Sequence, residues 1–77
     1  MFAERHPRIA LDAKICHGKP VIKGTRVMVS TVLGHLAGGD PIAQIVADFG
    51  IADEDVRAAI AYALDVLDRE QHYPLSA

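Results

Sequence analysis

Several residue types are scarce in this sequence, and each scarcity narrows what the chain can be. Among 77 residues there is no tryptophan, and there are only two phenylalanines, two tyrosines and one cysteine, Cys16. A single cysteine cannot form an internal disulfide, and no apolar run follows a basic start, so we expect a cytoplasmic protein. No stretch approaches the roughly 18 consecutive apolar residues of a membrane span, so we expect no membrane association.

Residues for catalysis or metal binding are also sparse. The histidines are far apart, and only Cys16 and His17 are neighbours, which is not a zinc-ligand spacing. Asp53, Glu54 and Asp55 are adjacent, so on a helix they point in different directions and cannot converge on one bond. A chain this short can hardly enclose a catalytic pocket. We therefore expect no enzymatic activity, cofactor, metal or small-molecule substrate.

Aliphatic side chains, by contrast, are abundant, because hydrophobic residues make up 51% of the chain. The length fits one domain over residues 1–77, near the lower size limit for a core without disulfide or metal support. Such a chain leaves apolar surface for association, so we expect a homodimer.

The net charge of −2 hides an uneven distribution. In residues 1–39, six cations oppose two carboxylates, which gives +4; in residues 40–77, two cations oppose eight carboxylates, which gives −6. This division predicts either two surfaces with different partners or simply two solvated faces.

The stretch GKPVIKGTRVMVS, residues 18–30, predicts a β-hairpin. Lys23 and Gly24 lie between two β-prone runs, and glycine at the second position of a two-residue loop suits a hairpin turn. A phosphate-binding loop is excluded, because Lys23 precedes the glycine and a strand follows. Residues 8–12 alternate as a short strand that pairs with the hairpin or with a second copy. Residues 8–29 thus form a strand and a hairpin.

Residues 30–70 predict three helices. The first begins at Val29 or Ser30 and ends at Gly38-Gly39. The second is capped by Asp40 and ends at Gly50. The third begins in the acidic cluster at residues 53–55, with Asp53 as its cap, and runs to about residue 69. Its expected apolar stripe is Val56, Ile60, Ala63, Leu64 and Leu67.

The second and third helices also have the spacing of a helix-turn-helix, with Gly50 at the turn. The exposed start of the third helix carries Asp53 and Glu54, which would repel DNA phosphates. If DNA is bound, we expect the contacts at Lys19, Lys23 and Arg26 near the hairpin. The alternative is that Lys23 is a polar turn residue and Arg26 a cross-strand or capping group.

The motif GKPVIKGTRVMV, with Ile15-Cys16-His17-Gly18 before it, resembles a family of small prokaryotic domains of unknown function described as antitoxins of type II, VapB-like toxin–antitoxin pairs. The resemblance implies a mainly α fold: a three-helix, homeodomain-like helix-turn-helix bundle preceded by a short N-terminal strand and β-hairpin. It also implies a homodimer and a PIN-like ribonuclease toxin as partner. We assign structural roles to these motif and turn residues: Gly18, Pro20, Gly24, Thr25 and Gly50.

The acidic half would cover the basic RNA-binding groove of such a nuclease, and we expect the contact at Asp65, Asp68 and Glu70. Three functions remain open at this point. They are an antitoxin that also binds DNA to autoregulate, a DNA-binding regulator without a toxin, and a small dimerisation or interaction module.

Overall fold

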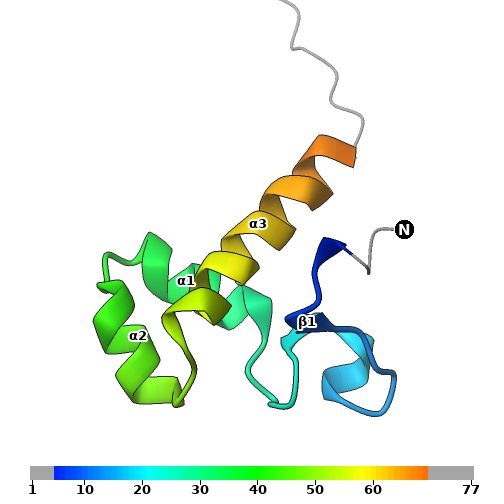
Figure 1. Cartoon of the computed structure of the whole chain (residues 1–77), viewed down its shortest axis with the longest axis horizontal. Coiled ribbons are helices and arrows are strands. Elements are labelled where there is room, and N and C mark those ends of the chain that lie inside the picture. Colours follow the sequence, from blue (N-terminus) through cyan, green and yellow to red (C-terminus); the bar gives the residue numbers. More distant parts are fainter. Residues whose placement is uncertain (1–4, 70–77) are drawn as a thin grey trace, which may run out of the picture.

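The computed structural model describes residues 5–69, which form two short strands, one short 3-10 turn and three α-helices (Figure 1). The elements in chain order are β1 (Ile9–Ala10), η2 (Cys16–Gly18), β2 (Val21–Ile22), α1 (Val29–Ala37), α2 (Ile42–Phe49) and α3 (Asp53–Arg69). The predicted mainly helical class is therefore confirmed. Among these elements, no helix has the length and apolar character needed to cross a membrane.

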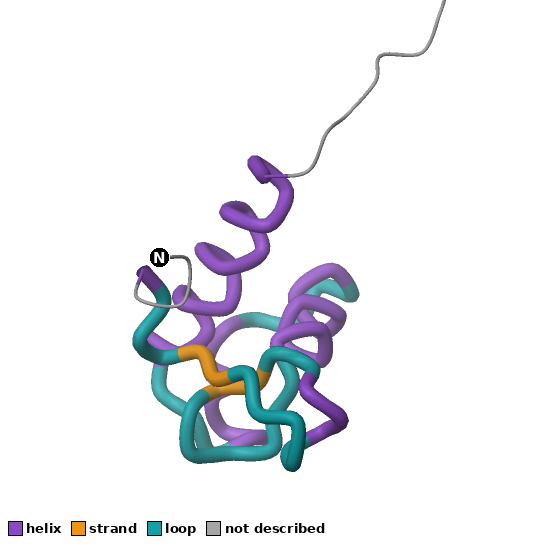
Figure 2. Tube along the Cα trace, turned by 90° about the vertical axis from the view of Figure 1, so that its right-hand side faces the viewer, coloured by secondary structure: helices purple, strands orange, loops and turns teal. Residues whose placement is uncertain are grey.

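The two strands form an antiparallel pair, with Ile9 opposite Ile22 and Ala10 opposite Val21. Figure 2 shows this pair beside the helical part of the molecule. The N-terminal strand was expected to pair with the hairpin or with a second copy, and the structure places it on β2 of the same chain. The pairing is short because the chain leaves the sheet for η2 soon after Ala10.

The hairpin turn after β2 is wider than predicted. The returning chain meets β2 through a bridge between Val21 and Met28, so four residues, 23–26, form the loop and not two. Thr25 explains the difference. Its hydroxyl donates to the Ile22 carbonyl at 2.7 Å and accepts from the Val27 N–H at 3.0 Å, so it stabilises the turn and not the ladder.

Helices α1 and α2 occupy the predicted positions, and Gly50 ends α2 with a left-handed φ of 64°. The prediction that Asp40 caps α2 is wrong. Pro41 is the N-cap residue, with an extended backbone, and no side chain caps this helix. The Asp40 carboxylate instead lies 2.7 Å from His35 Nδ1 at the end of α1. Since Pro41 delays the helix start by one residue, Asp40 turns back toward α1.

The start of α3 is also capped differently from the prediction. The Ala52 carbonyl accepts the backbone N–H groups of Asp55 and Val56, at 3.0 and 3.3 Å. The Asp55 carboxylate accepts the Ala52 N–H in return, at 2.9 Å. The second bond is one half of a capping box, in which the acidic side chain of the third helical residue accepts the N-cap N–H; Ala52 has no side-chain oxygen to supply the other half. Asp53, the predicted cap, accepts a hydrogen bond from Arg57 instead.

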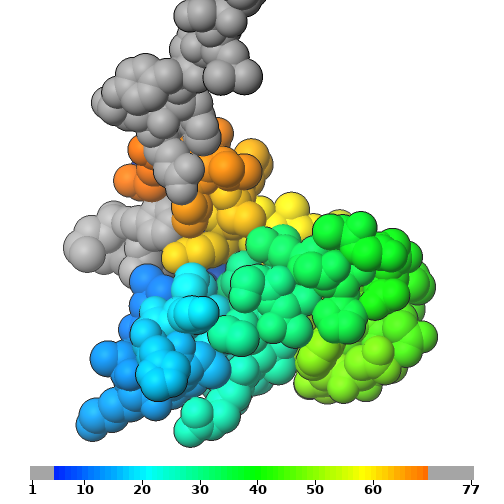
Figure 3. Space-filling model, turned by 180° about the vertical axis from the view of Figure 1, so that it is seen from behind, coloured from blue at the N-terminus to red at the C-terminus, as the bar shows by residue number. Residues whose placement is uncertain are grey.

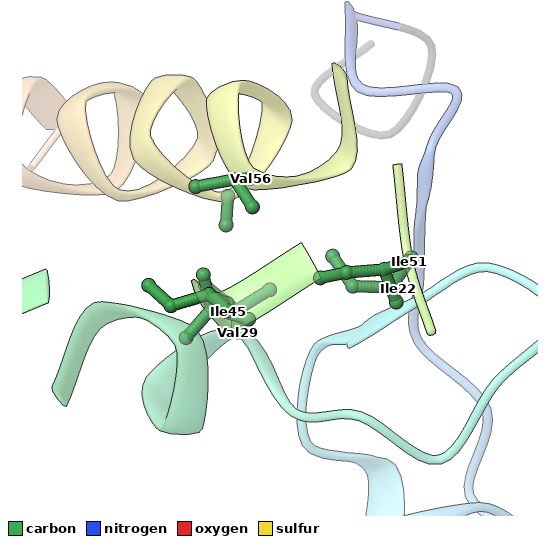
Figure 4. Close-up of a cluster of buried hydrophobic side chains, with 7 residues drawn as sticks. Ile22, Val29, Ile45, Ile51 and Val56 are labelled. Carbon is green, nitrogen blue, oxygen red and sulfur yellow. The ribbon is translucent and has the colours of Figure 1, made fainter. Parts of the chain in front are cut away.

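The core lies between the sheet and all three helices (Figure 4). Its buried aliphatic members are Ile22, Val29, Val32, Ile45, Ile51, Val56 and Ala59. Helix α3 buries Val56 and Ala59, whereas Ile60, Leu64 and Leu67 of the predicted stripe are exposed. These three side chains lie on the side of α3 that faces away from the core, and the C-terminal half of α3 extends beyond α1 and α2 (Figures 1 and 3).

Candidate functional site

Charge pairing divides the cations of this protein into two groups. Arg5, Arg8, Arg57 and Arg69 each lie within ion-pair distance of an aspartate. Within residues 5–69, the other cations form no ion pair; they are Lys14, Lys19, Lys23 and Arg26. All four are exposed and lie within thirteen residues of sequence. We call residues 14–26 the basic segment.

The basic segment is held together by backbone geometry. Cys16, His17 and Gly18 have φ values of 50°, 59° and 81°, which curl η2 into a left-handed turn. The Cys16 thiol donates to the Arg26 carbonyl at 3.6 Å, so η2 lies beside the end of the β2 turn. Lys23 is fixed through its own N–H, which donates to the Arg8 carbonyl at 2.7 Å. These contacts join the loop of Lys14 and Lys19 to the turn of Lys23 and Arg26.

The sequence prediction named Lys19, Lys23 and Arg26 but not Lys14. In the sequence, Lys14 contributes to the +4 charge of residues 1–39, but it lies outside the motif, so nothing else marked it as a candidate.

The motif residues have local structural contacts. Gly24 has a φ of 81°, which only glycine adopts without strain, and the Pro20 carbonyl accepts the N–H of Val29 at 2.9 Å.

The predicted partner-binding residue Asp65 has contacts within its own chain. Its carboxylate accepts a hydrogen bond from His6 Nε2 at 2.8 Å and lies 3.4 Å from Arg69 and 3.8 Å from Arg5. The His6 hydrogen bond, followed by the two arginines, lowers the pKa of Asp65, although partial burial opposes this. The imidazole of His6 is buried against Tyr62, with the two rings edge to face. Asp65 therefore holds the N-terminal segment on α3.

The other two predicted partner contacts differ from Asp65. Asp68 is exposed and forms no ion pair with any residue in the range 5–69. Glu70 lies outside the described residues. Of the three positions, the structure thus presents Asp68 as an accessible carboxylate.

The exposed start of α3 is acidic, as the sequence predicted. Asp53 and Glu54 are exposed, and the Asp53 carboxylate holds the guanidinium of Arg57 at 2.8 Å. That hydrogen bond raises the pKa of Arg57. Asp55 accepts a hydrogen bond from Arg8 at 2.9 Å, which ties the segment before β1 to this end of the helix. A negatively charged ligand would meet repulsion here.

An apolar groove of about 480 Å³ separates α1 from the C-terminal half of α3. Its lining residues are Lys19, Pro20, Val29, Ser30, Leu33, Tyr62, Ala63, Val66 and Leu67. Within residues 5–69, no three histidine, cysteine or acidic side chains gather where they could hold a metal ion. The groove is chemically suited to an apolar side chain, not to a charged substrate.

Comparison with known proteins gives one solved relative and one family. No curated protein matches the chain. A crystal structure of Rv2018 from Mycobacterium tuberculosis is similar, with 33% identity and a TM-score of 0.63, over 68% of this chain and 24% of that one. The chain thus spans about a quarter of the length of Rv2018. The family described as "Protein of unknown function (DUF433)" matches residues 9–63, from β1 into α3. The chain therefore belongs to the DUF433 family.

Proposed function

We propose that this chain is the DNA-binding antitoxin of a type II toxin–antitoxin pair, whose partner is a PIN-like ribonuclease. The observation that carries the DNA-binding half is the basic segment, in which four exposed cations have no ionic partner among residues 5–69. The ribonuclease half is supported by the motif in residues 18–29 and by the acidic second half of the chain.

Unpaired cations favour binding to phosphates for a simple reason. When Lys19, Lys23 or Arg26 contacts a phosphate, no ion pair between residues in the range 5–69 is broken, and counterions are released from the DNA. Arg57 and Arg8 would first have to leave Asp53 and Asp55. Contacts of this kind position a protein on DNA and are sensitive to salt.

The helix pair α2 and α3 is joined by three residues, as in a helix-turn-helix. In such a unit, the second helix reads bases with its N-terminal face. Here that face carries Asp53, Glu54 and an Arg57 already bound to Asp53. We therefore propose that α3 supports the fold and that the basic segment makes the DNA contacts.

An electrophoretic shift with DNA from the chain's own promoter tests the DNA-binding half. We expect the variant K19A/K23A/R26A to lose binding, with the slope of log affinity against log salt reduced by up to about 3. The control is R57A, which removes a paired arginine from the helix-turn-helix face and should bind as the wild type. Equal binding by the triple variant, or loss confined to R57A, would show that the basic segment is not the DNA-binding surface.

Co-purification with a ribonuclease encoded by an adjacent gene tests the antitoxin half. The variant D68K should retain less ribonuclease, because Asp68 is an exposed, unpaired carboxylate in the described range. Asp48 is similarly exposed on α2, and among residues 5–69 its side chain bonds only to Gln44, so D48K is the matched control. Reversal at Asp65 would also release His6, and it is avoided here. If the wild type retains no ribonuclease, the chain is a regulator without a toxin.

A further inference from the structure

One side chain of the basic segment differs from the rest in the hydrogen bonds that it can offer to DNA. Arg26 has a planar guanidinium, whose paired N–H groups match the O6 and N7 acceptors of guanine in the major groove. The other three cations of the segment are lysines, whose ammonium groups act as flexible point charges. The segment contains no asparagine or glutamine. Arg26 is therefore the residue of this segment best suited to recognise a base.

Two neighbouring polar side chains are poorer candidates for this role. The hydroxyl of Thr25 donates to the Ile22 carbonyl and accepts from the Val27 N–H, so its hydrogen is already used inside the turn. His17 is exposed, but a neutral imidazole offers one N–H donor and no fork. Neither side chain can give a base the two parallel hydrogen bonds that the guanidinium provides.

Hydrogen bonds fix the backbone on both sides of Arg26. Before it, the Thr25 N–H donates to the Ile22 carbonyl at 3.0 Å, and after it, the Val27 carbonyl accepts the Ile22 N–H at 2.8 Å. The carbonyl of Arg26 itself accepts from the Cys16 thiol at 3.6 Å. Its guanidinium is exposed and forms no ion pair with any residue in the range 5–69. The structure thus presents a free guanidinium on a pre-organised backbone, which lowers the entropy lost on binding.

The shape of the turn favours the major groove. Residues 23–26 connect β2 to the returning chain, which pairs with it through the bridge between Val21 and Met28. Paired strands lie about 4.8 Å apart, so such a turn and its side chains fit a groove about 12 Å wide better than one about 6 Å wide. Figure 1 shows this part of the chain at the lower edge of the molecule, away from the free end of α3.

We propose that Arg26 gives the DNA contact its sequence preference, by donating two hydrogen bonds to O6 and N7 of one guanine in the major groove. This inference rests on the DNA-binding half of the proposed function. Lys14, Lys19 and Lys23 contact the flanking phosphates, which position the turn without reading the sequence. The guanidinium of Arg57 on α3 makes no such contact, because it is held by Asp53.

The variant R26K separates base reading from charge. We expect it to bind promoter DNA about tenfold more weakly than the wild type, because the fork is lost. Its affinity for an unrelated duplex of the same length, and its salt slope, should stay near those of the wild type, because the positive charge remains. The matched control is K23R, which also keeps the charge and lies in the same exposed turn. It should leave the ratio of the two affinities unchanged.

A substitution in the DNA identifies the contacted atom. In 7-deazaguanine, N7 is replaced by a carbon, whereas the pairing with cytosine and the minor-groove edge are kept. We expect this substitution, made at one promoter guanine for each bound chain, to weaken the wild type about tenfold and to leave R26K almost unaffected. Fluorescence anisotropy titrations of both proteins against each duplex measure the four affinities of the cycle.

The possible failures of the inference and of the proposed function are distinguishable. A promoter preference that survives in R26K, or deazaguanine effects of equal size in R26K and the wild type, overturns the role of Arg26 and leaves DNA binding intact. A wild type that binds promoter and unrelated duplexes equally well overturns that role too. A wild type that binds neither duplex contradicts the proposed DNA binding itself, and the inference with it.

Discussion

Three aspartates of α3 have the same side chain and three different environments. Asp53 binds a guanidinium on its own helix, Asp55 caps the helix and holds Arg8, and Asp65 holds His6 from a segment 59 residues away. Position on the helix does not explain these differences. They depend on which cation or N–H group the fold brings to each carboxylate.

The lowered pKa of Asp65 predicts a pH dependence of stability. A carboxylate whose pKa is lower in the folded than in the unfolded state stabilises the fold at pH values above its ordinary pKa of 3.8. That contribution is lost as the pH falls from this value through the lower folded pKa. We expect D65N to be less stable than the wild type at pH 6 and to lose less of its stability between pH 6 and pH 3.

Urea unfolding at the two pH values measures this, with D68N as the control, because Asp68 forms no ion pair within residues 5–69. An equal loss for D65N and the wild type between the two pH values would mean that Asp65 is not responsible for this acid sensitivity.

Two glycines should respond in opposite directions to the same substitution. Gly50 has a φ of 64°, so G50A should lower the free energy of unfolding by about 1 kcal/mol. Gly34 is inside α1, and a Cβ there would meet no atom within 4 Å, so G34A should raise the free energy of unfolding by about 0.5 to 1 kcal/mol. Thermal unfolding of both variants beside the wild type measures the two shifts. Shifts of the same sign would contradict the backbone assignment at one of these positions.

At the scale of elements, the start of α3 connects the helix to the N-terminal segment. D55A removes the acceptor of the Ala52 N–H and the partner of Arg8, so we expect the free energy of unfolding to fall by about 1 to 2 kcal/mol. D53A, two residues earlier, removes an exposed contact to Arg57 and should cost less than about 0.5 kcal/mol. Chemical denaturation of the pair distinguishes them. Equal losses would mean that the cap and the Arg8 contact contribute nothing beyond surface charge.

The helices were predictable from the sequence because their signals are local. Periodic aliphatic residues and the glycines after α1 and α2 place their bounds within a residue or two. The β2 turn was less predictable, because the side chain of Thr25 competes with the strand ladder. The apolar stripe predicted for α3 includes Ile60, Leu64 and Leu67, which the structure leaves exposed, because periodicity alone does not tell which part of an apolar face is covered.

The candidate site was predictable only in part, for a related reason. Composition places cations in the first half of the chain, but only the fold decides which of them are paired. Arg8 looked equivalent to Lys19 in the sequence, and the structure binds it to Asp55, 47 residues away. Likewise, nothing near Asp65 in the sequence identifies His6 as its partner.

At the scale of the whole molecule, the proposed DNA contact depends on the number of chains that bind together. A homodimer, which the sequence predicts, would present two basic segments on one particle, so binding of the first would raise the effective concentration of the second. We therefore expect two chains on each promoter site, which sedimentation of the protein–DNA complex measures. One chain per site would mean that each chain binds DNA alone.

The Arg8 contact to Asp55 and the His6 contact to Asp65 have a consequence for folding during synthesis of the chain. His6 and Arg8 leave the ribosome well before α3, because their partners lie 59 and 47 residues later in the sequence. Closing loops of this length costs entropy. The strand pair does not have to wait, because Ile9 and Ile22 are close in the sequence and both precede the helices. We therefore expect β1 and β2 to pair first, and the side chains of His6 and Arg8 to find their carboxylates only after α3 has formed.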